Sequence, residues 1–260
     1  MTIGSPMVLP KTPSFRLDGK RALVTGGSKG LGLAAAAALA AAGAHVTICA
    51  RAAKELHEAE TSVRDAGGQV ASLVLDVNDI AAVQTAIAAA APFDILINNA
   101  GTNRPSTFLD VSVDDFDAIM GLNVRAAYFV AQAVAKRMAE AGKGGSIIHI
   151  SSQMGHVGGA NRTVYCASKA AIEGLTKAMA IDLAKHQIRV NTIGPTFIET
   201  PLTKPFFENA EFKASVLQKI KLGRLGQVED IMGAVVFLAS DASALMTGTS
   251  MIIDGGWTAD

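Results

Sequence analysis

The residues of this chain best suited to chemistry are a tyrosine and a lysine near its middle. Tyr165 and Lys169 are four residues apart in a segment with a helical pattern, so their side chains share one helix face. A positive charge beside a phenol favours the phenolate and lowers a pKa that is about 10 in solution. Ser152 lies thirteen residues before Tyr165, where its hydroxyl can hydrogen-bond a substrate oxygen. Together these side chains predict proton transfer at a carbonyl or alcohol oxygen.

A glycine-rich loop near the start of the chain predicts a phosphate site. Residues 25–32 read TGGSKGLG and join an apolar run to an Ala-rich helical pattern. Glycine lets the backbone approach a pyrophosphate, and the N-terminus of a helix offers free N–H groups and the positive end of its dipole. The place of this loop between a first strand and a first helix favours nucleotide binding over a plain tight turn.

The end of the second predicted strand indicates which nucleotide binds. An acidic residue there would hold the ribose 2′-hydroxyl of NAD, but this chain has Ala50 followed by Arg51. A guanidinium pairs well with a 2′-phosphate, and Lys29 in the glycine loop supplies a second cation. We therefore expect NADP(H), with NAD(H) less favoured. In the alternative interpretation, Arg51 only begins a helix and Lys29 is solvated.

The elements that must position these residues alternate along the chain. Helical patterns occupy 31–43, 52–68, about 112–142 and about 163–186, and they separate short apolar runs. Strands separated by helices run parallel, with helices on both faces of the sheet. The seven candidate strands are 21–27, 45–51, 70–77, 93–101, 145–152, 188–195 and 250–256.

One domain accounts for nearly all of the chain. Three prolines within residues 1–14 predict a flexible N-terminal arm, and residues 15–260 form one α/β catalytic domain. The long irregular interval at about 195–225 precedes the last strand and is predicted to be a substrate loop.

The ordered motifs resemble those of the short-chain dehydrogenase/reductase family over nearly the whole chain. They are TGxxxGxG at 25–32, Asp76-Val77, Asn98-Asn99-Ala100-Gly101, Asn123, Ser152, Tyr165-x-x-x-Lys169 and Gly194-Pro195. The resemblance implies a single Rossmann-type doubly wound domain with a seven-stranded parallel sheet. It also implies hydride transfer between a nicotinamide and a ketone or secondary alcohol, in a homotetramer.

The same resemblance assigns roles to individual residues. It implies that Ser152, Tyr165, Lys169 and Asn123 are catalytic, with Asn123 in a water relay near Lys169. It implies contacts to adenine from Asp76 and Val77, and to the nicotinamide carboxamide from Ile198 and Thr200. The expected cofactor-binding residues are Gly26, Ser28, Lys29, Gly30, Leu31, Gly32, Arg51, Asp76, Val77, Asn99, Ala100, Gly101, Tyr165, Lys169, Pro195, Thr196, Ile198 and Thr200. Thr196 stands where family members commonly have glycine.

The substrate is predicted less sharply. Residues 151–153 and 161–166 resemble dicarbonyl/L-xylulose reductases, and residues 99–105 resemble gluconate 5-dehydrogenases. Three polar residues are suited to hydrogen-bond a sugar, polyol or sugar acid: Gln153, Arg162 and Asn103. In the alternative interpretation they are solvated residues at the rim of the site. The alternatives are a 3-oxoacyl thioester reductase and, in another class, an NADP sensor without turnover.

Composition excludes several other classes. Lys plus Arg and Asp plus Glu both number 23, so no net charge attracts nucleic acid or a membrane surface. The two cysteines give no disulfide framework, and the five histidines lack metal-ligand spacing. The chain is therefore expected to be soluble, cytoplasmic and free of catalytic metal.

Overall fold

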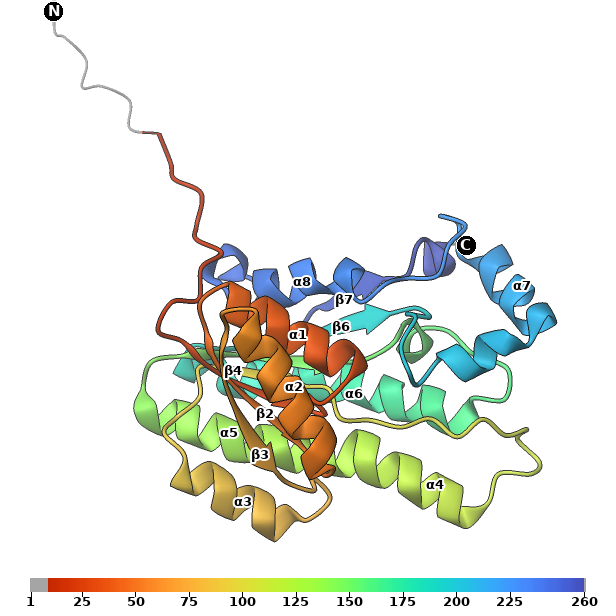
Figure 1. The fold of residues 1–260 in the computed structure, drawn as a ribbon, viewed down its shortest axis with the longest axis horizontal. Coiled ribbons are helices and arrows are strands. Elements are labelled where there is room, and N and C mark those ends of the chain that lie inside the picture. Colours follow the sequence, from red (N-terminus) through yellow and green to blue (C-terminus); the bar gives the residue numbers. More distant parts are fainter. Residues whose placement is uncertain (1–8, 260) are drawn as a thin grey trace, which may run out of the picture.

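A seven-stranded parallel sheet forms the centre of the computed structural model, which describes residues 9–259 (Figure 1). Its seven strands are parallel, as the alternating pattern predicts, and their order is β3-β2-β1-β4-β5-β6-β7. The order reverses between β1 and β4, and ligands of open α/β sheets bind at such a reversal. The strands are β1 Arg21–Thr25, β2 His45–Ala50, β3 Gln69–Val74, β4 Ile95–Asn98, β5 Gly145–Ile150, β6 Ile188–Pro195 and β7 Ser250–Ile253.

Helices cover both faces of this sheet (Figure 1). On one face α1, α2 and α8 pack against the strands, and on the other α3, α5 and α6 do so. The eight α-helices of the described residues are α1 Gly30–Ala41, α2 Ala53–Asp65, α3 Ile80–Ala89, α4 Val113–Met120, α5 Ala127–Ala141, α6 Thr163–Leu183, α7 Ala210–Lys219 and α8 Glu229–Ala239.

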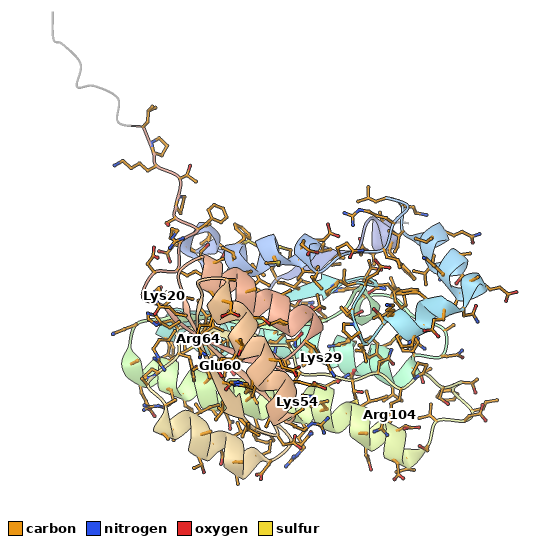
Figure 2. All side chains as sticks on the ribbon, viewed as in Figure 1. Lys20, Lys29, Lys54, Glu60, Arg64 and Arg104 are labelled. Carbon is orange, nitrogen blue, oxygen red and sulfur yellow. The ribbon has the colours of Figure 1, made fainter. Side chains whose placement is uncertain are left out.

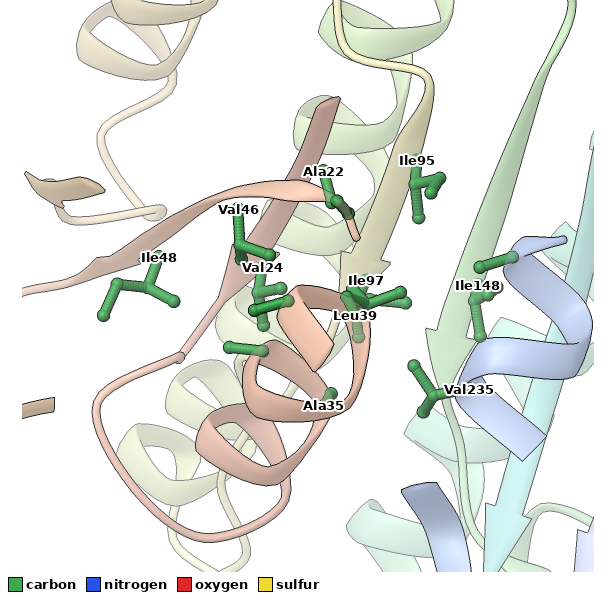
Figure 3. Packing of buried hydrophobic residues seen from close by; sticks show 14 of the residues in the cluster. Ala22, Val24, Ala35, Leu39, Val46, Ile48, Ile95, Ile97, Ile148 and Val235 are labelled. Carbon is green, nitrogen blue, oxygen red and sulfur yellow. The ribbon is translucent and has the colours of Figure 1, made fainter. Parts of the chain in front are cut away.

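The face under α1 shows why the sheet can hold this helix closely. Ala35 and Leu39 on α1 lie over Val24 and Ile97 of the central strands (Figure 3). Alanine adds little bulk, so the alanine-rich helix packs tightly on the β-branched side chains beneath it. The close packing fixes the glycine loop that immediately precedes α1.

Helices α4 and α5 form one continuous rod that contains a π-helical turn at Gly121–Ala126. By length and hydropathy, the run Val113–Ala141 could span a bilayer, and 44% of its most apolar window is buried in the fold. Val130, Val134 and Met138 belong to the core on the α3–α5 face, as expected of a core helix.

The N-terminal arm is described only in part. Residues 9–14 are exposed, form no helix or strand and lead away from the domain (Figure 1). The rest of the predicted arm, residues 1–8, lies outside the described residues. The predicted substrate loop contains a short 3₁₀ turn, Lys204–Glu208, and α7.

Candidate active site

One cavity of about 770 Å³ runs along the carboxyl edge of the sheet. It extends from the loop after β1 past the end of β5 to the segment after β6. Nearly every residue predicted for the site lines it, while Gly32 and Asn123 do not. The predicted lining residues are Gly26, Ser28, Lys29, Gly30, Leu31, Arg51, Asp76, Val77, Asn99, Ala100, Gly101, Asn103, Ser152, Gln153, Arg162, Tyr165, Lys169, Pro195, Thr196, Ile198 and Thr200.

The glycine loop has no room for side chains at its closest approach. A Cβ on Gly32 would lie 2.1 Å from the carbonyl oxygen of Gly26, so only glycine fits there. Gly26 and Gly30 have φ of 64° and 55°, in the region that favours glycine. No side chain in the described part of the chain caps the first turn of α1, which leaves its N–H groups available to an anion at this end of the cavity.

Two asparagines at the end of β4 stabilise this loop. Asn99 donates its amide to the carbonyl oxygens of Thr25 and Gly26, at 3.0 and 3.1 Å. Asn98 is buried and donates to the carbonyl of Ala127 at 2.7 Å. Asn98 is therefore structural. The contact from Asn99 to the loop backbone is a role the sequence did not predict.

The end of the cavity near β2 is cationic. Arg51 is exposed and lines the cavity beside Ala50. Lys29 of the glycine loop, labelled in Figure 2, lines the same cavity. Lys29 also forms an ion pair with Glu55, with 3.3 Å between Nζ and Oε2. Arg51 is thus the cation here with no ion pair among the described residues, which suits it to a phosphate.

The three residues of the proton-transfer prediction meet at the end of β5. Lys169 Nζ lies 5.6 Å from the centre of the Tyr165 ring and donates to the Ile150 carbonyl at 2.8 Å. The Ser152 hydroxyl donates to Gln153 Oε1 at 2.8 Å and accepts from the Met154 amide at 3.1 Å. All three line the cavity, so a substrate oxygen there can reach both hydroxyls.

Burial controls the protonation of this group. It raises the pKa of Tyr165, and the Ser152 hydroxyl opposes that change. The sequence predicted a lowered pKa from Lys169; the structure shows the opposite because removal from water penalises the phenolate more. Burial also lowers the pKa of Lys169 to about 8, against an opposing effect of Glu173.

Asn123 lies beneath the site, on the π-helical turn. Its amide nitrogen donates to the Thr102 carbonyl at 2.9 Å and to Ser168 Oγ at 3.0 Å, and its Oδ1 accepts from the Thr102 amide at 2.8 Å. Asn123 therefore joins the loop after β4 to α6, next to Lys169. The predicted water relay stays a prediction.

Two buried polar residues near Lys169, Glu173 and His149, were not predicted from the sequence. Glu173 accepts hydrogen bonds from Thr192 Oγ1 at 3.1 and 3.0 Å, and its carboxylate lies 3.4 Å from His156 Nε2. His149 on β5 is fully enclosed, and burial followed by the charge of Lys169 lowers its pKa to about 4. The lysine is thus flanked by one buried carboxylate and one neutral imidazole.

The other end of the cavity carries the residues predicted for substrate. Gln153 and Arg162 are buried, and Arg162 lies over the ring of Phe206, 5.5 Å from its centre. Asn103 Oδ1 is buried with no hydrogen-bond partner among the described residues, so it is a free acceptor for a ligand. Phe206 was not predicted, because the sequence shows only an aromatic residue in a long loop.

Comparisons with known proteins place the chain among oxidoreductases. The profile of a family described as "Enoyl-(Acyl carrier protein) reductase" matches residues 26–258. The chain is 39% identical to D-erythrulose reductase of Gallus gallus over 94% of its length and 98% of that protein. It is also 39% identical to gluconate 5-dehydrogenase of Gluconobacter oxydans, over 94% and 96% of the two chains.

Solved structures agree with these relatives. A gluconate 5-dehydrogenase of Burkholderia cenocepacia in complex with NADP and tartrate superposes with a TM-score of 0.91. It is 38% identical, and the match covers 95% of this chain and 98% of that one. A short-chain type dehydrogenase/reductase of Mycobacterium marinum, 39% identical, gives a TM-score of 0.90 over 95% and 98% of the two chains.

Proposed function

Because the chain belongs to the short-chain dehydrogenase/reductase family, we propose that it interconverts a ketone and a secondary alcohol with NADP(H), Tyr165 transferring the proton. The substrate is a sugar, polyol, sugar acid or small carbonyl compound. The observation that carries the proposal is the meeting of Ser152, Tyr165 and Lys169 in the cavity that the glycine loop also lines.

The residues of the cavity fit NADP. The glycine loop offers free N–H groups to the pyrophosphate, and Arg51 with Lys29 suits the 2′-phosphate. Near the other end, where the carboxamide would bind, Thr196 Oγ1 is buried with no hydrogen-bond partner among residues 9–259. The relatives crystallised with NADP support this choice of cofactor. When bound, the cofactor supplies or accepts the hydride.

The protein's own side chains then manage the substrate oxygen. Ser152 donates a hydrogen bond to it and fixes its position, and Tyr165 donates the proton during reduction or accepts it during oxidation. The charge of Lys169 stabilises the phenolate that remains, and an oxidised nicotinamide would add positive charge on the same side. These charges oppose the effect of burial on the pKa of Tyr165.

A turnover assay tests the proposal directly. Purified protein is given NADPH or NADH with ketoses, oxo sugar acids, small diketones and a 3-oxoacyl thioester, and loss of reduced cofactor is followed by absorbance. Tyr165→Phe should lower turnover by about 10²–10⁴-fold while NADPH still binds. Near-normal turnover of Tyr165→Phe would overturn the role of Tyr165. Tight NADPH binding with no turnover of any compound would favour the sensor alternative.

One observation supports the alternative of a 3-oxoacyl thioester substrate, and another argues against it. The matching family profile is described as "Enoyl-(Acyl carrier protein) reductase", which names a carrier-bound acyl substrate, and exposed lysines follow β6. However, Arg224 in that segment is engaged by Asp230, with hydrogen bonds of 2.6 and 2.8 Å. A carrier protein would need a basic surface at the cavity mouth, and this cation of the segment is neutralised, so the sugar-type substrate is favoured.

We also propose a cytoplasmic homotetramer. Phe116, Tyr128 and Ile181 on α4, α5 and α6 are 46%, 44% and 79% exposed, which is typical of helices that pack against another subunit. Sedimentation equilibrium should give four times the mass of the chain, and Ile181→Glu should shift the protein toward smaller species. A monomer at all concentrations would contradict this assembly.

A further inference from the structure

Arg162 is a buried cation with unused hydrogen-bond donors. Its side chain precedes α6, and the residue is 7% exposed. A guanidinium carries five N–H donors. One of them, on Nη1, bonds the Asn161 carbonyl at 3.2 Å, and the described residues offer this guanidinium no other hydrogen bond and no ion pair. Enclosing a guanidinium without an anion is unfavourable, so this arrangement is suited to an anionic ligand.

The guanidinium is located where a substrate must lie. Arg162 lines the 770 Å³ cavity together with Ser152 and Tyr165, and it is the residue that immediately precedes α6, the helix that carries Tyr165. Arg162 also lines a neighbouring cavity of about 480 Å³, and Phe206 borders both. The pair therefore borders both spaces, in the cavity that Ser152 and Tyr165 also line.

Local structure holds the guanidinium in place. Asn161 has a left-handed backbone with φ of 57°, a conformation that asparagine tolerates better than most residues. Its carbonyl accepts from the Ser106 amide at 3.2 Å as well as from Arg162. The Phe206 ring lies 5.5 Å from the guanidinium carbon on another side. A group held in this way loses little freedom when it binds a ligand.

The charges lining the cavities are consistent with an anion. The acidic residues that line the larger cavity are Glu55 on α2 and Asp76 after β3, both on the side of the cationic phosphate end. Among the described residues that line the smaller cavity, none is acidic, and Lys219 is a second cation. No carboxylate therefore competes with a ligand for Arg162.

We propose that Arg162 binds the carboxylate of an oxo or hydroxy acid and so selects sugar acids over neutral ketoses and polyols. A carboxylate matches two parallel N–H groups of a guanidinium, and Asn103 Oδ1 is free to accept from a hydroxyl of the same molecule. This inference rests on the proposed function, because it names the substrate class of that same site.

A matched pair of substrates tests it. 5-Oxo-D-gluconate and L-sorbose differ only in a carboxylate replacing a CH₂OH group. In wild-type protein with NADPH, kcat/KM should favour the acid by about tenfold or more. Arg162→Gln should lower the acid-to-neutral ratio of kcat/KM by about 10–100-fold, and Arg162→Lys should retain part of it. Lys219→Gln, which removes the second cation of the smaller cavity, should leave the ratio unchanged.

Binding without turnover separates this inference from the proposed function. D-Gluconate and D-glucitol are titrated calorimetrically into the NADP⁺ complex of Tyr165→Phe protein, with and without Arg162→Gln. Gluconate should bind more tightly, and Arg162→Gln should remove the difference. Equal binding of the two compounds, or an unchanged kcat/KM ratio in Arg162→Gln, would overturn the inference. Absence of turnover with Arg162-dependent gluconate binding would instead refute the reaction and leave the carboxylate site standing.

Discussion

Lys169 and Glu173 place opposite charges on successive turns of α6, and both residues are buried. Burial lowers the pKa of the lysine to about 8, and the carboxylate raises it against that effect. Glu173 is itself held by Thr192, whose hydroxyl donates to both carboxylate oxygens. The charge on the residue beside Tyr165 thus depends on a group outside the cavity.

Removing the charge of Glu173 should change how reduction depends on pH. In Glu173→Gln the pKa of Lys169 falls further below about 8, so the lysine loses its proton at lower pH. The decline of kcat/KM toward alkaline pH should then begin at lower pH than in wild-type protein. Thr192→Val is the control, since it removes the hydrogen bonds and keeps the carboxylate. Superimposable pH profiles for Glu173→Gln and wild type would contradict this coupling.

Replacing Arg51 should weaken the preference for NADP. A hydrogen bond to a charged group contributes about 1.5–3 kcal/mol, so Arg51→Ala should lower the NADPH-to-NADH ratio of kcat/KM by about 10–100-fold. Lys29→Ala should have a smaller effect because Lys29 is already paired with Glu55. Steady-state kinetics with both cofactors measure the ratios. A larger effect for Lys29 than for Arg51 would reverse the assignment.

The glycine loop should not tolerate a methyl group at its tightest point. Gly32→Ala puts Cβ against the Gly26 carbonyl, which should destabilise the fold by about 1–3 kcal/mol and abolish NADPH binding. Gly233→Ala on α8 is the matched control: its Cβ meets nothing within 4 Å. That change should stabilise the protein by about 0.5–1 kcal/mol. NADPH fluorescence and urea denaturation distinguish the two variants, and normal binding by Gly32→Ala would refute the close approach.

His149 should make the fold sensitive to mild acid. The folded pKa is about 4, below the usual value of 6.5, so between these values the unfolded chain binds a proton that the folded chain does not. Stability from this residue is therefore present above about pH 6.5 and falls by about 2 kcal/mol by about pH 5.

His149→Leu provides the comparison. Its free energy of unfolding should change less between about pH 7.5 and about pH 5 than that of wild type, as measured by urea denaturation. Both ring nitrogens of His149 are without partners among the described residues, so the variant removes no hydrogen bond seen there. An equal acid sensitivity in the two proteins would assign the effect to other groups.

The parallel sheet was predictable from the alternation of strands and helices, and much of the site was predictable from local spacing. The order of the strands was not predicted. Tyr165 and Lys169 share a helix face by their separation alone, and the glycine loop is marked by its place after β1. Helix α3 was not assigned, although Asp79 caps it by accepting from the Ala82 amide at 3.0 Å. That signal was present in the sequence and was missed.

Other features depend on segments that are distant in sequence. Arg162 has no anionic partner among the described residues because the segment 195–225 brings an aromatic ring, Phe206, near its guanidinium. The raised pKa of Tyr165 follows from burial, which no residue pattern encodes. Such properties are set by the folded surroundings of a residue, and its neighbours along the chain do not reveal them.

The π-helical turn at Gly121–Ala126 changes the rotation of α4 relative to α5 about their common axis. It accommodates an extra residue within one continuous rod, so α4 can pack on α6 while α5 packs on the sheet. Deleting one residue there would restore regular α-helical winding and rotate α4 by about 100° relative to α5. The rod would lose a single residue, yet Asn123 could no longer face the loop after β4.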